Sequence, residues 1–329
     1  MDLMEFHHLN EVLAVLTSIV LNLTLMRLAL TENGSFLKFY RKLIVLNASS
    51  ELLAKLLMAL SQPMFQFADG VNIFIATGPL RHLPINYHYH LLLLYAMGVG
   101  IGFLTIPLDF LYRYYVVCLE RNVESHQVLL WVLIAYVLAA WDAVFMTLGF
   151  VHLSPKAIDY KPSFAFLNES MWRENGRRMT FIVGTIENPY SLTFVISASL
   201  YVTAEYISIF ILSHRIMKKL AERRHLMSAK TLEMQRGMNK MLLSQALVPL
   251  FTGLFPILGM TSTLLLRLSD HRIGIVVSSM MAWLPSASPI CTIWFIGSFR
   301  QRVFPFWRSS RSSHVSAIGI TEIAPPAAK

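Results

Sequence analysis

Seven apolar stretches, each long enough to cross a bilayer as a helix, constrain the fold of this chain more than any motif does. They occupy residues 9–30, 43–67, 89–117, 128–151, 192–213, 241–266 and 273–296. A hydrocarbon core of ~30 Å needs about 20 helical residues, and each stretch reaches that length. A transmembrane barrel would instead show alternating segments of about 10 residues. The sequence therefore predicts an all-α membrane protein, a bundle of seven transmembrane helices.

The composition fits a chain that lies mostly in lipid. Hydrophobic residues make up 55% of the 329 residues and charged residues 14%, whereas soluble domains have about 25% charged residues. No connector is long enough to hold a second folded domain. We expect one seven-helix domain over residues 1–300 and a cytoplasmic tail, disordered, over residues 301–329.

Basic residues are concentrated on one side of the predicted membrane. The connectors after the first, third, fifth and seventh stretches carry 3, 1, 8 and 5 Lys and Arg, 17 together, whereas the other three connectors carry 1, 5 and 2, or 8 together. By the positive-inside rule the first group is cytoplasmic, so the N-terminus is expected outside and the tail inside. The net charge of +9 therefore indicates a lipid bilayer as a partner and not nucleic acid. No motif for catalysis, metal binding or a cofactor is present, and we expect no enzyme.

Two acid–base pairs lie inside the predicted spans, Glu51 with Lys55 and Asp109 with Arg113. Each base follows its acid by four residues, so the partners share one face of a helix. Unpaired charge is costly in a bilayer, and each pair is expected to neutralise itself within its own helix. Two interpretations of the second pair stay open: it only buries charge, or, together with Tyr114, it is a cytoplasmic switch that breaks when the bundle opens.

Two further acids, Asp142 in the fourth stretch and Glu205 in the fifth, have no basic partner in their own helices. They are expected to face the bundle interior or to be protonated, because a carboxylate exposed to lipid is hard to sustain. His88 and His90 give only a weak metal signal. Gly98 and Gly102 have the small-xxx-small spacing that lets a neighbouring helix approach closely.

Prolines and sequons complete the candidate positions. Proline removes a helical hydrogen bond, so the prolines of the last two spans are candidate hinges; they are Pro249, Pro256, Pro285 and Pro289, and Pro107 lies in the third span. Of four Asn-x-Ser/Thr sequons, Asn22 and Asn47 fall inside spans and Asn33 is on the cytoplasmic side. Asn168, in the second outer connector, is the one expected to be open to glycosylation.

Several segments together resemble the nematode serpentine chemoreceptors of the Str superfamily, class delta above all. They are MSAKT at 227–231, Gln235, LSQALVP at 243–249 with Pro256, YRYY at 112–115, Leu284-Pro285 with Pro289, Phe299-Arg300, Thr77-Gly78-Pro79, and Tyr40-Arg41 leading into Leu46-Asn47-Ala48. Members often carry a cysteine after the Gly-Pro and another near the start of the third helix. Here Leu80 and residues 87–90 include none, and the two cysteines, Cys118 and Cys291, lie elsewhere.

The resemblance implies a receptor that senses small chemicals, signals through a heterotrimeric G protein, and lies in the plasma or ciliary membrane of sensory neurons. We expect its ligand to enter from outside between the third, fifth, sixth and seventh helices, under the connector 154–191. The basic surface of residues 215–240, with Arg113 and Tyr114 beside it, would then meet the G protein. Two alternatives remain: a ligand-gated channel or transporter, and a membrane protein that assists assembly of other receptors.

Overall fold

The computed structural model describes residues 3–31, 35–121, 123–151, 172–174, 177–222, 240, 243–244, 246–248 and 250–304. Its longer helices are α1 (Leu3–Thr31), α2 (Ser35–Ser61), α3 (Ile85–Leu104), α4 (Ile106–Val117), α5 (Ser125–Leu148) and α7 (Pro189–Glu222). The chain continues through η4 (Leu250–Leu254), α9 (Phe255–Leu265), α10 (His271–Met281), α11 (Leu284–Phe295) and α12 (Gly297–Val303). Within these ranges, six helical segments are long and apolar enough to span a bilayer, and α10 with α11, bent by 43°, form the seventh. The prediction of seven spans is confirmed.

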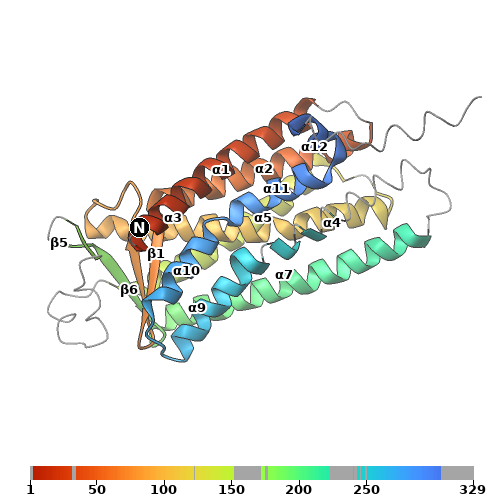
Figure 1. Ribbon diagram of the computed structural model, residues 1–329. Helices are drawn as coiled ribbons and strands as arrows, with labels where there is room; N and C mark the ends of the chain where they lie inside the picture. Colours follow the sequence, from red (N-terminus) through yellow and green to blue (C-terminus); the bar gives the residue numbers. More distant parts are fainter. Residues whose placement is uncertain are drawn as a thin grey trace, which may run out of the picture.

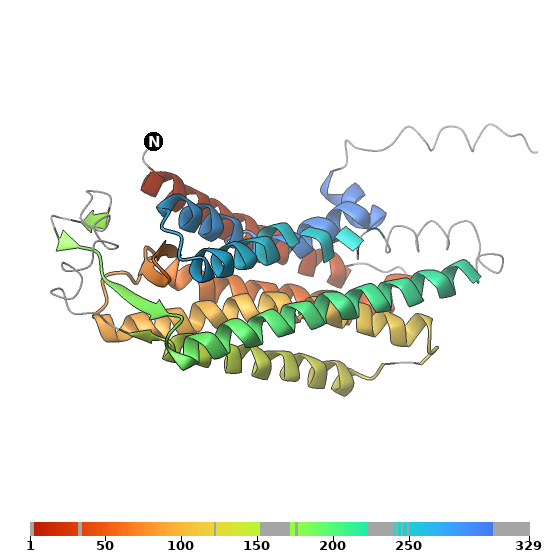
Figure 2. The same ribbon diagram turned by 90° about the horizontal axis from the view of Figure 1, so that it is seen from below.

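The helices lie side by side along one long axis, and the two ends of the bundle differ (Figures 1 and 2). The N-terminus and the β-strands lie at one end, which we call the N-terminal end. Helix α12 and the last turns of α4 and α7 lie at the other, the α12 end. The expected tail lies outside the described residues from 305 onward, and α12 runs to Val303, past the expected boundary at residue 300.

Large apolar side chains cover the outside of the bundle. On α5 they include Leu129 and Val137, and on α7 they include Leu200 and Phe210, which is 75% exposed. A monomer in water would not expose so much contiguous apolar surface, whereas in a bilayer this surface meets lipid tails. The bundle is therefore built with an apolar exterior as well as an apolar core.

A four-stranded antiparallel sheet lies across the N-terminal end, in the order β1-β2-β6-β3. Its strands are β1 (Pro63–Ala68), β2 (Val71–Ala76), β3 (Phe150–Val151) and β6 (Phe181–Thr185). The described part of the second outer connector also holds a two-stranded ribbon of β4 (Arg173–Glu174) and β5 (Arg177–Arg178). Sheet residues pack with the helices below them into one apolar cluster that includes Phe65, Phe74, Leu92, Met146 and Ile182.

The sheet corrects the second predicted span, which does not run as a helix to residue 67. Helix α2 ends at Ser61, and Gln62 follows with a left-handed φ of 41° before Pro63 begins β1. Both features are typical of a helix stop. Asp69 (φ 49°) and Gly70 (φ 75°) then join Ala68 to Val71 in a two-residue hairpin turn. An Asp-Gly pair suits the positive φ values that such a turn requires.

Three glycines of α3 permit close approach of three different helices. A Cβ at Gly98 would lie 2.7 Å from Ala54 O of α2, and one at Gly100 would lie 2.8 Å from Ala139 Cβ of α5. A Cβ at Gly102 would lie 3.3 Å from Leu284 of α11. The sequence predicted one helix close to both Gly98 and Gly102, but Gly98 lies against α2 and Gly102 against α11. Helix α3 thus packs against three helices at its glycines.

Prolines mark the interruptions in the spans. Pro107, Pro256 and Pro285 occupy the first turn of α4, α9 and α11, where a missing N–H costs little. Pro289 lies inside α11, and Pro249 falls outside the described residues. The third, sixth and seventh spans are thus each made of two successive helical segments.

Candidate functional site

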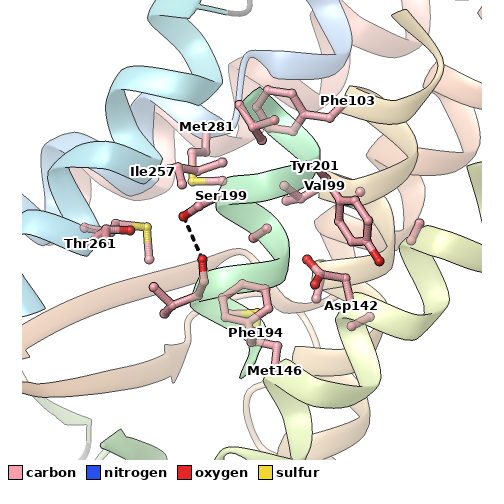
Figure 3. Close-up of a pocket in the computed structure, with 18 of the residues that line it drawn as sticks. Val99, Phe103, Asp142, Met146, Phe194, Ser199, Tyr201, Ile257, Thr261 and Met281 are labelled. Carbon is pink, nitrogen blue, oxygen red and sulfur yellow. Dashed lines mark hydrogen bonds between the residues drawn. The ribbon is translucent and has the colours of Figure 1, made fainter. Parts of the chain in front are cut away.

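A cavity of about 120 Å³ lies beneath the sheet, inside the helix bundle (Figure 3). Helices α3, α5, α7 and α9 form its walls, and Met281 of α10 also contributes. Most of the lining is apolar, as Figure 3 shows for Val99, Phe103, Met146 and Ile257. An apolar cavity of ~150 Å³ in another protein binds benzene. The present space is somewhat smaller, so it suits a compact organic molecule of about one ring.

Strands β1 and β2 close the cavity at the N-terminal end. Phe65, Phe67 and Asn72 of these strands belong to its lining. The ring of Phe65 lies 5.6 Å from that of Tyr95, and its backbone N donates to Ser278 Oγ of α10 at 3.0 Å. Strand β1, which covers the cavity, therefore contacts both α3 and α10.

The cavity adds the fourth span to the helices expected around a ligand. It lies between the third, fourth, fifth and sixth spans, with Met281 from the seventh; a ligand position between the third, fifth, sixth and seventh helices stays a prediction. Its roof comes from the first outer connector through β1 and β2. The second outer connector reaches the sheet through β6, which pairs with β2; residues 152–171 of that connector, including Asn168, lie outside the described residues.

The polar residues of the lining come from several elements; they are Asn72, Tyr95, Asp142, Ser199, Tyr201, Glu205 and Thr261. Ser197 of α7 lies outside the lining. Ser197, Tyr201 and Glu205 follow one another at intervals of four residues, so they share a face. The Ser197 hydroxyl donates a hydrogen bond to the Asp142 carboxylate of α5. Figure 3 shows Tyr201 and Asp142 reaching toward the same part of the cavity. Sequence analysis singled out the two acids but not Ser197 or Tyr201, which only the packing of α5 on α7 brings together.

Glu205 is the least satisfied polar group of the cavity. Its side chain is only 5% exposed, and neither carboxylate oxygen has a hydrogen-bond partner among the described residues. The lining includes Asp142 as a second acid and, within the described part of the chain, no Lys, Arg or His. The cavity is thus an apolar chamber with two acids and no base.

Comparison with known proteins agrees with this architecture and with the sequence resemblance. Residues 6–305 match the family model described as "Serpentine type 7TM GPCR chemoreceptor Srd". The chain belongs to this receptor family. The predicted resemblance to class delta serpentine chemoreceptors is confirmed.

Two individual relatives come from Caenorhabditis elegans. The receptor is 32% identical over 98 residues to serpentine receptor class delta-19, covering 30% of this chain and 29% of that protein. It is 32% identical over 107 residues to serpentine receptor class delta-18, covering 31% and 30%. The chain thus aligns with less than a third of the length of these curated relatives.

A solved structure shares the fold over nearly the whole receptor. Squid rhodopsin superposes with a TM-score of 0.59 at 10% identity, covering 98% of this chain and 93% of that chain. At this identity the likeness concerns the fold alone. It supports the arrangement of seven helices in this receptor.

A buried ion pair in this receptor differs from the one predicted for Glu51 and Lys55. Lys55 Nζ, with its side chain 0% exposed, lies 3.7 Å from Glu11 Oε2 of α1 and donates to Ala282 O at 2.8 Å. Ala282 O sits at the break between α10 and α11, where Ser286 N bonds to Trp283 O. The predicted pairing of Glu51 with Lys55 within α2 was wrong. The Lys55 ammonium group instead contacts Glu11 of α1 and the Ala282 carbonyl of the seventh span. Glu11 is an acid inside the first apolar stretch, and this position is the sequence signal that identifies it as a candidate partner of a buried base.

The second predicted pair is also replaced. Asp109 accepts a hydrogen bond from the Asn47 amide of α2, and it lines a space of about 10 Å³ together with Glu51. Asp109 and Arg113, both among the described residues, form no ion pair with each other. Asn47 and Glu51, four residues apart on α2, both lie beside Asp109. The acid of the third span therefore contacts α2 and not its own helix. The sequence could not show this contact because it depends on helix packing.

Arg113 and Tyr114 occupy different surroundings at the α12 end. The Arg113 side chain is buried, with 1% of the residue exposed. Tyr114 instead contacts α7, because Arg215 Nη1 donates a hydrogen bond to Tyr114 OH at 3.3 Å. The Arg215 guanidinium carbon lies 5.9 Å from the Tyr114 ring centre. Tyr114 therefore links α4 to α7 where both approach the α12 end.

The remaining candidates in the described part of the chain make the following contacts. His88 Nε2 and His90 Nδ1 each lie 3.2 Å from a backbone oxygen, of Leu83 and Asn86 respectively. No disulfide joins Cys118 and Cys291, of which Cys291 is buried in α11. The Asn22 side chain is buried and donates to Pro285 O at 3.2 Å.

Proposed function

We propose that this chain is a G-protein-coupled chemosensory receptor whose small-molecule ligand occupies the cavity beneath the sheet. The observation that carries the proposal is the cavity itself, a mostly apolar chamber of about 120 Å³ inside a bundle that belongs to a chemoreceptor family. Its walls come from four spans, so a ligand would touch helices that reach the opposite end of the molecule. The receptor lies in a membrane, and we propose the plasma or ciliary membrane of sensory neurons as its location.

The signalling step we propose is a shift between two states of the bundle. A ligand that binds one state more tightly than the other moves the equilibrium by that difference in affinity. Helix α7 extends from the cavity to Glu222 at the α12 end, so a displacement of its cavity face would reach Arg215 and its contact with Tyr114. Interruptions at Pro256 and Pro285 allow the sixth and seventh spans to change their bend, as hinges do.

The proposed partner at the α12 end is a heterotrimeric G protein. Arg215, Lys218 and Lys219 project from the last turns of α7, and Arg300 and Arg302 from α12. Such a basic surface suits an acidic partner, and it also suits anionic lipid headgroups. The two alternatives from the sequence, a channel or transporter and an assembly protein, find no support in the family or the fold.

The test is a screen of volatile and water-soluble chemicals against the expressed chain, with nucleotide exchange on purified Gα subunits as the readout. Surface display of the chain is measured in the cells that express it. This measurement separates an absent response from absent protein. The proposal predicts ligand-evoked exchange by displayed receptor. Ligand-evoked conductance in cells that lack G proteins, without exchange, would contradict it and favour the channel.

A further inference from the structure

The polar groups of the cavity, in contrast to its apolar walls, indicate what chemical group the ligand carries. The described residues that line it supply two carboxyl groups and no basic side chain. The buried Lys55 is bound to Glu11 and Ala282. Among the described residues, none supplies a counter-charge to these two acids.

Glu205 is the group that most needs such a partner. It is 95% buried, it lines the cavity from α7, and both of its oxygens lack a hydrogen-bond partner among the described residues. Buried polar groups in proteins are almost always paired, and an unpaired one calls for an explanation. Asp142 differs, because the Ser197 hydroxyl already donates to it.

We infer that the cavity binds a small amphipathic amine, with its ammonium group on Glu205 and its apolar body against the aromatic and aliphatic walls. This inference rests on the proposed function for its physiological meaning, but the binding it describes can be measured alone. An ammonium group has donors for both oxygens of the Glu205 carboxylate and no acceptor, which matches a site that offers acceptors. A neutral hydrocarbon would donate no hydrogen bond to either acid.

The walls are suited to a cation as well as to an apolar body. Tyr95, Phe103, Phe194 and Tyr201 supply aromatic rings to the lining. The face of an aromatic ring attracts ammonium groups, most strongly where water is excluded. The cavity volume limits the ligand to a compact skeleton such as one aromatic or cyclohexyl ring with a short aminoalkyl chain.

The experiment uses the full chain in lipid nanodiscs and three probes of one skeleton: 2-phenylethylamine, 2-phenylethanol and 3-phenylpropanoate. Binding is measured by calorimetry at pH 7, where the first probe is a cation, the second neutral and the third an anion. Benzylamine and cyclohexylmethylamine extend the amine set to shorter and non-aromatic bodies. We expect the best amine to bind at least tenfold more tightly than the alcohol, and the anion not to bind.

The variants separate charge from shape. Glu205→Gln keeps the size of the side chain and should weaken amine binding at least tenfold while leaving alcohol binding unchanged. Asp142→Asn should produce a smaller loss. Glu51→Gln is the matched control, since Glu51 is likewise a buried acid (4% exposed) with an unpartnered oxygen, but it lines a different space. It should leave the affinity of every probe unchanged.

Three results would overturn the inference: no amine of the set binds, the alcohol binds as tightly as the amines, or Glu205→Gln binds amines as the wild type does. Thermal unfolding of each variant reports whether it is folded. If Glu205→Gln does not fold, the comparison of probes on the wild-type chain and the Asp142→Asn variant decides. Amine binding without nucleotide exchange would uphold this inference and contradict the proposed function, and exchange evoked only by neutral compounds would do the reverse.

Discussion

Replacing Lys55 by methionine should destabilise the receptor, and the loss should depend on Glu11 and not on Glu51. Lys55 Nζ is buried and lies 3.7 Å from Glu11 Oε2. At that separation and an effective dielectric constant of about 20, the gross attraction is about 4.5 kcal/mol. Removing one partner of a buried pair leaves the other charge uncompensated, which costs about 3–5 kcal/mol. The free energy of unfolding of Lys55→Met should fall by that amount.

A double-mutant cycle identifies the partner. Glu11→Gln removes the orphaned charge, so the double variant Lys55→Met with Glu11→Gln should recover about 2–3 kcal/mol, the coupling expected of residues in contact. Lys55→Met with Glu51→Gln is the control, because Glu51 has the i, i+4 spacing to Lys55 but no contact with it in the structure. It should show no recovery.

The assay is unfolding of the purified chain in detergent, together with surface display in cells. Every Lys55 variant also removes the hydrogen bond from Lys55 Nζ to Ala282 O. This part of the loss in unfolding free energy should therefore remain whichever acid is changed. The reasoning is refuted if Glu51→Gln rescues Lys55→Met, or if Glu11→Gln and Lys55→Met are additive.

Three further predictions concern packing, the broken helix and orientation. Gly98→Ala should lower the free energy of unfolding by about 1–3 kcal/mol, since its Cβ would lie 2.7 Å from Ala54 O, whereas Gly297→Ala, with nothing within 4 Å, should change it little; equal unfolding midpoints would contradict this. Asn22→Ala should cost about 1–3 kcal/mol in the wild type, because it takes a donor from Pro285 O, and less in a Pro289→Ala background, where the restored N–H can bond that oxygen; a loss of equal size in both backgrounds would contradict the account. A tag before Met1 should be labelled on intact cells and a tag after Lys329 only after permeabilisation, because 17 of 25 connector Lys and Arg lie on the expected inner side; the opposite labelling would reverse the orientation.

The number of spans could be read from the sequence because the length and apolar character of each segment are local properties. The end of the second helix could also have been read, since Pro63 and the Asp69-Gly70 pair are local signals for a stop and a hairpin. The apolar run through Phe67 concealed them, because a fully buried strand such as β1 has the same composition as a membrane helix.

The partners of the buried charges could not be read in the same way. The i, i+4 spacing of Glu51 to Lys55 describes one helix, whereas the contacts of Lys55 come from α1 and from the break between α10 and α11. Likewise, Asp142 and Glu205 could be recognised as interior acids from the sequence. That α5 and α7 place both in one cavity depends on helix packing, which a single sequence does not encode in any local pattern.

If a chemical activates the receptor through the cavity beneath the sheet, filling this cavity should remove the response. Ala198 lines the cavity from α7, and Ala198→Phe would place a ring in the ligand's space. The measurement is nucleotide exchange on purified Gα, as a function of the concentration of an active compound, for wild type and variant displayed at equal levels. We expect the variant to keep basal exchange, and its half-maximal concentration to rise at least tenfold or its response to be lost. An unchanged concentration dependence in a folded Ala198→Phe receptor would contradict this expectation.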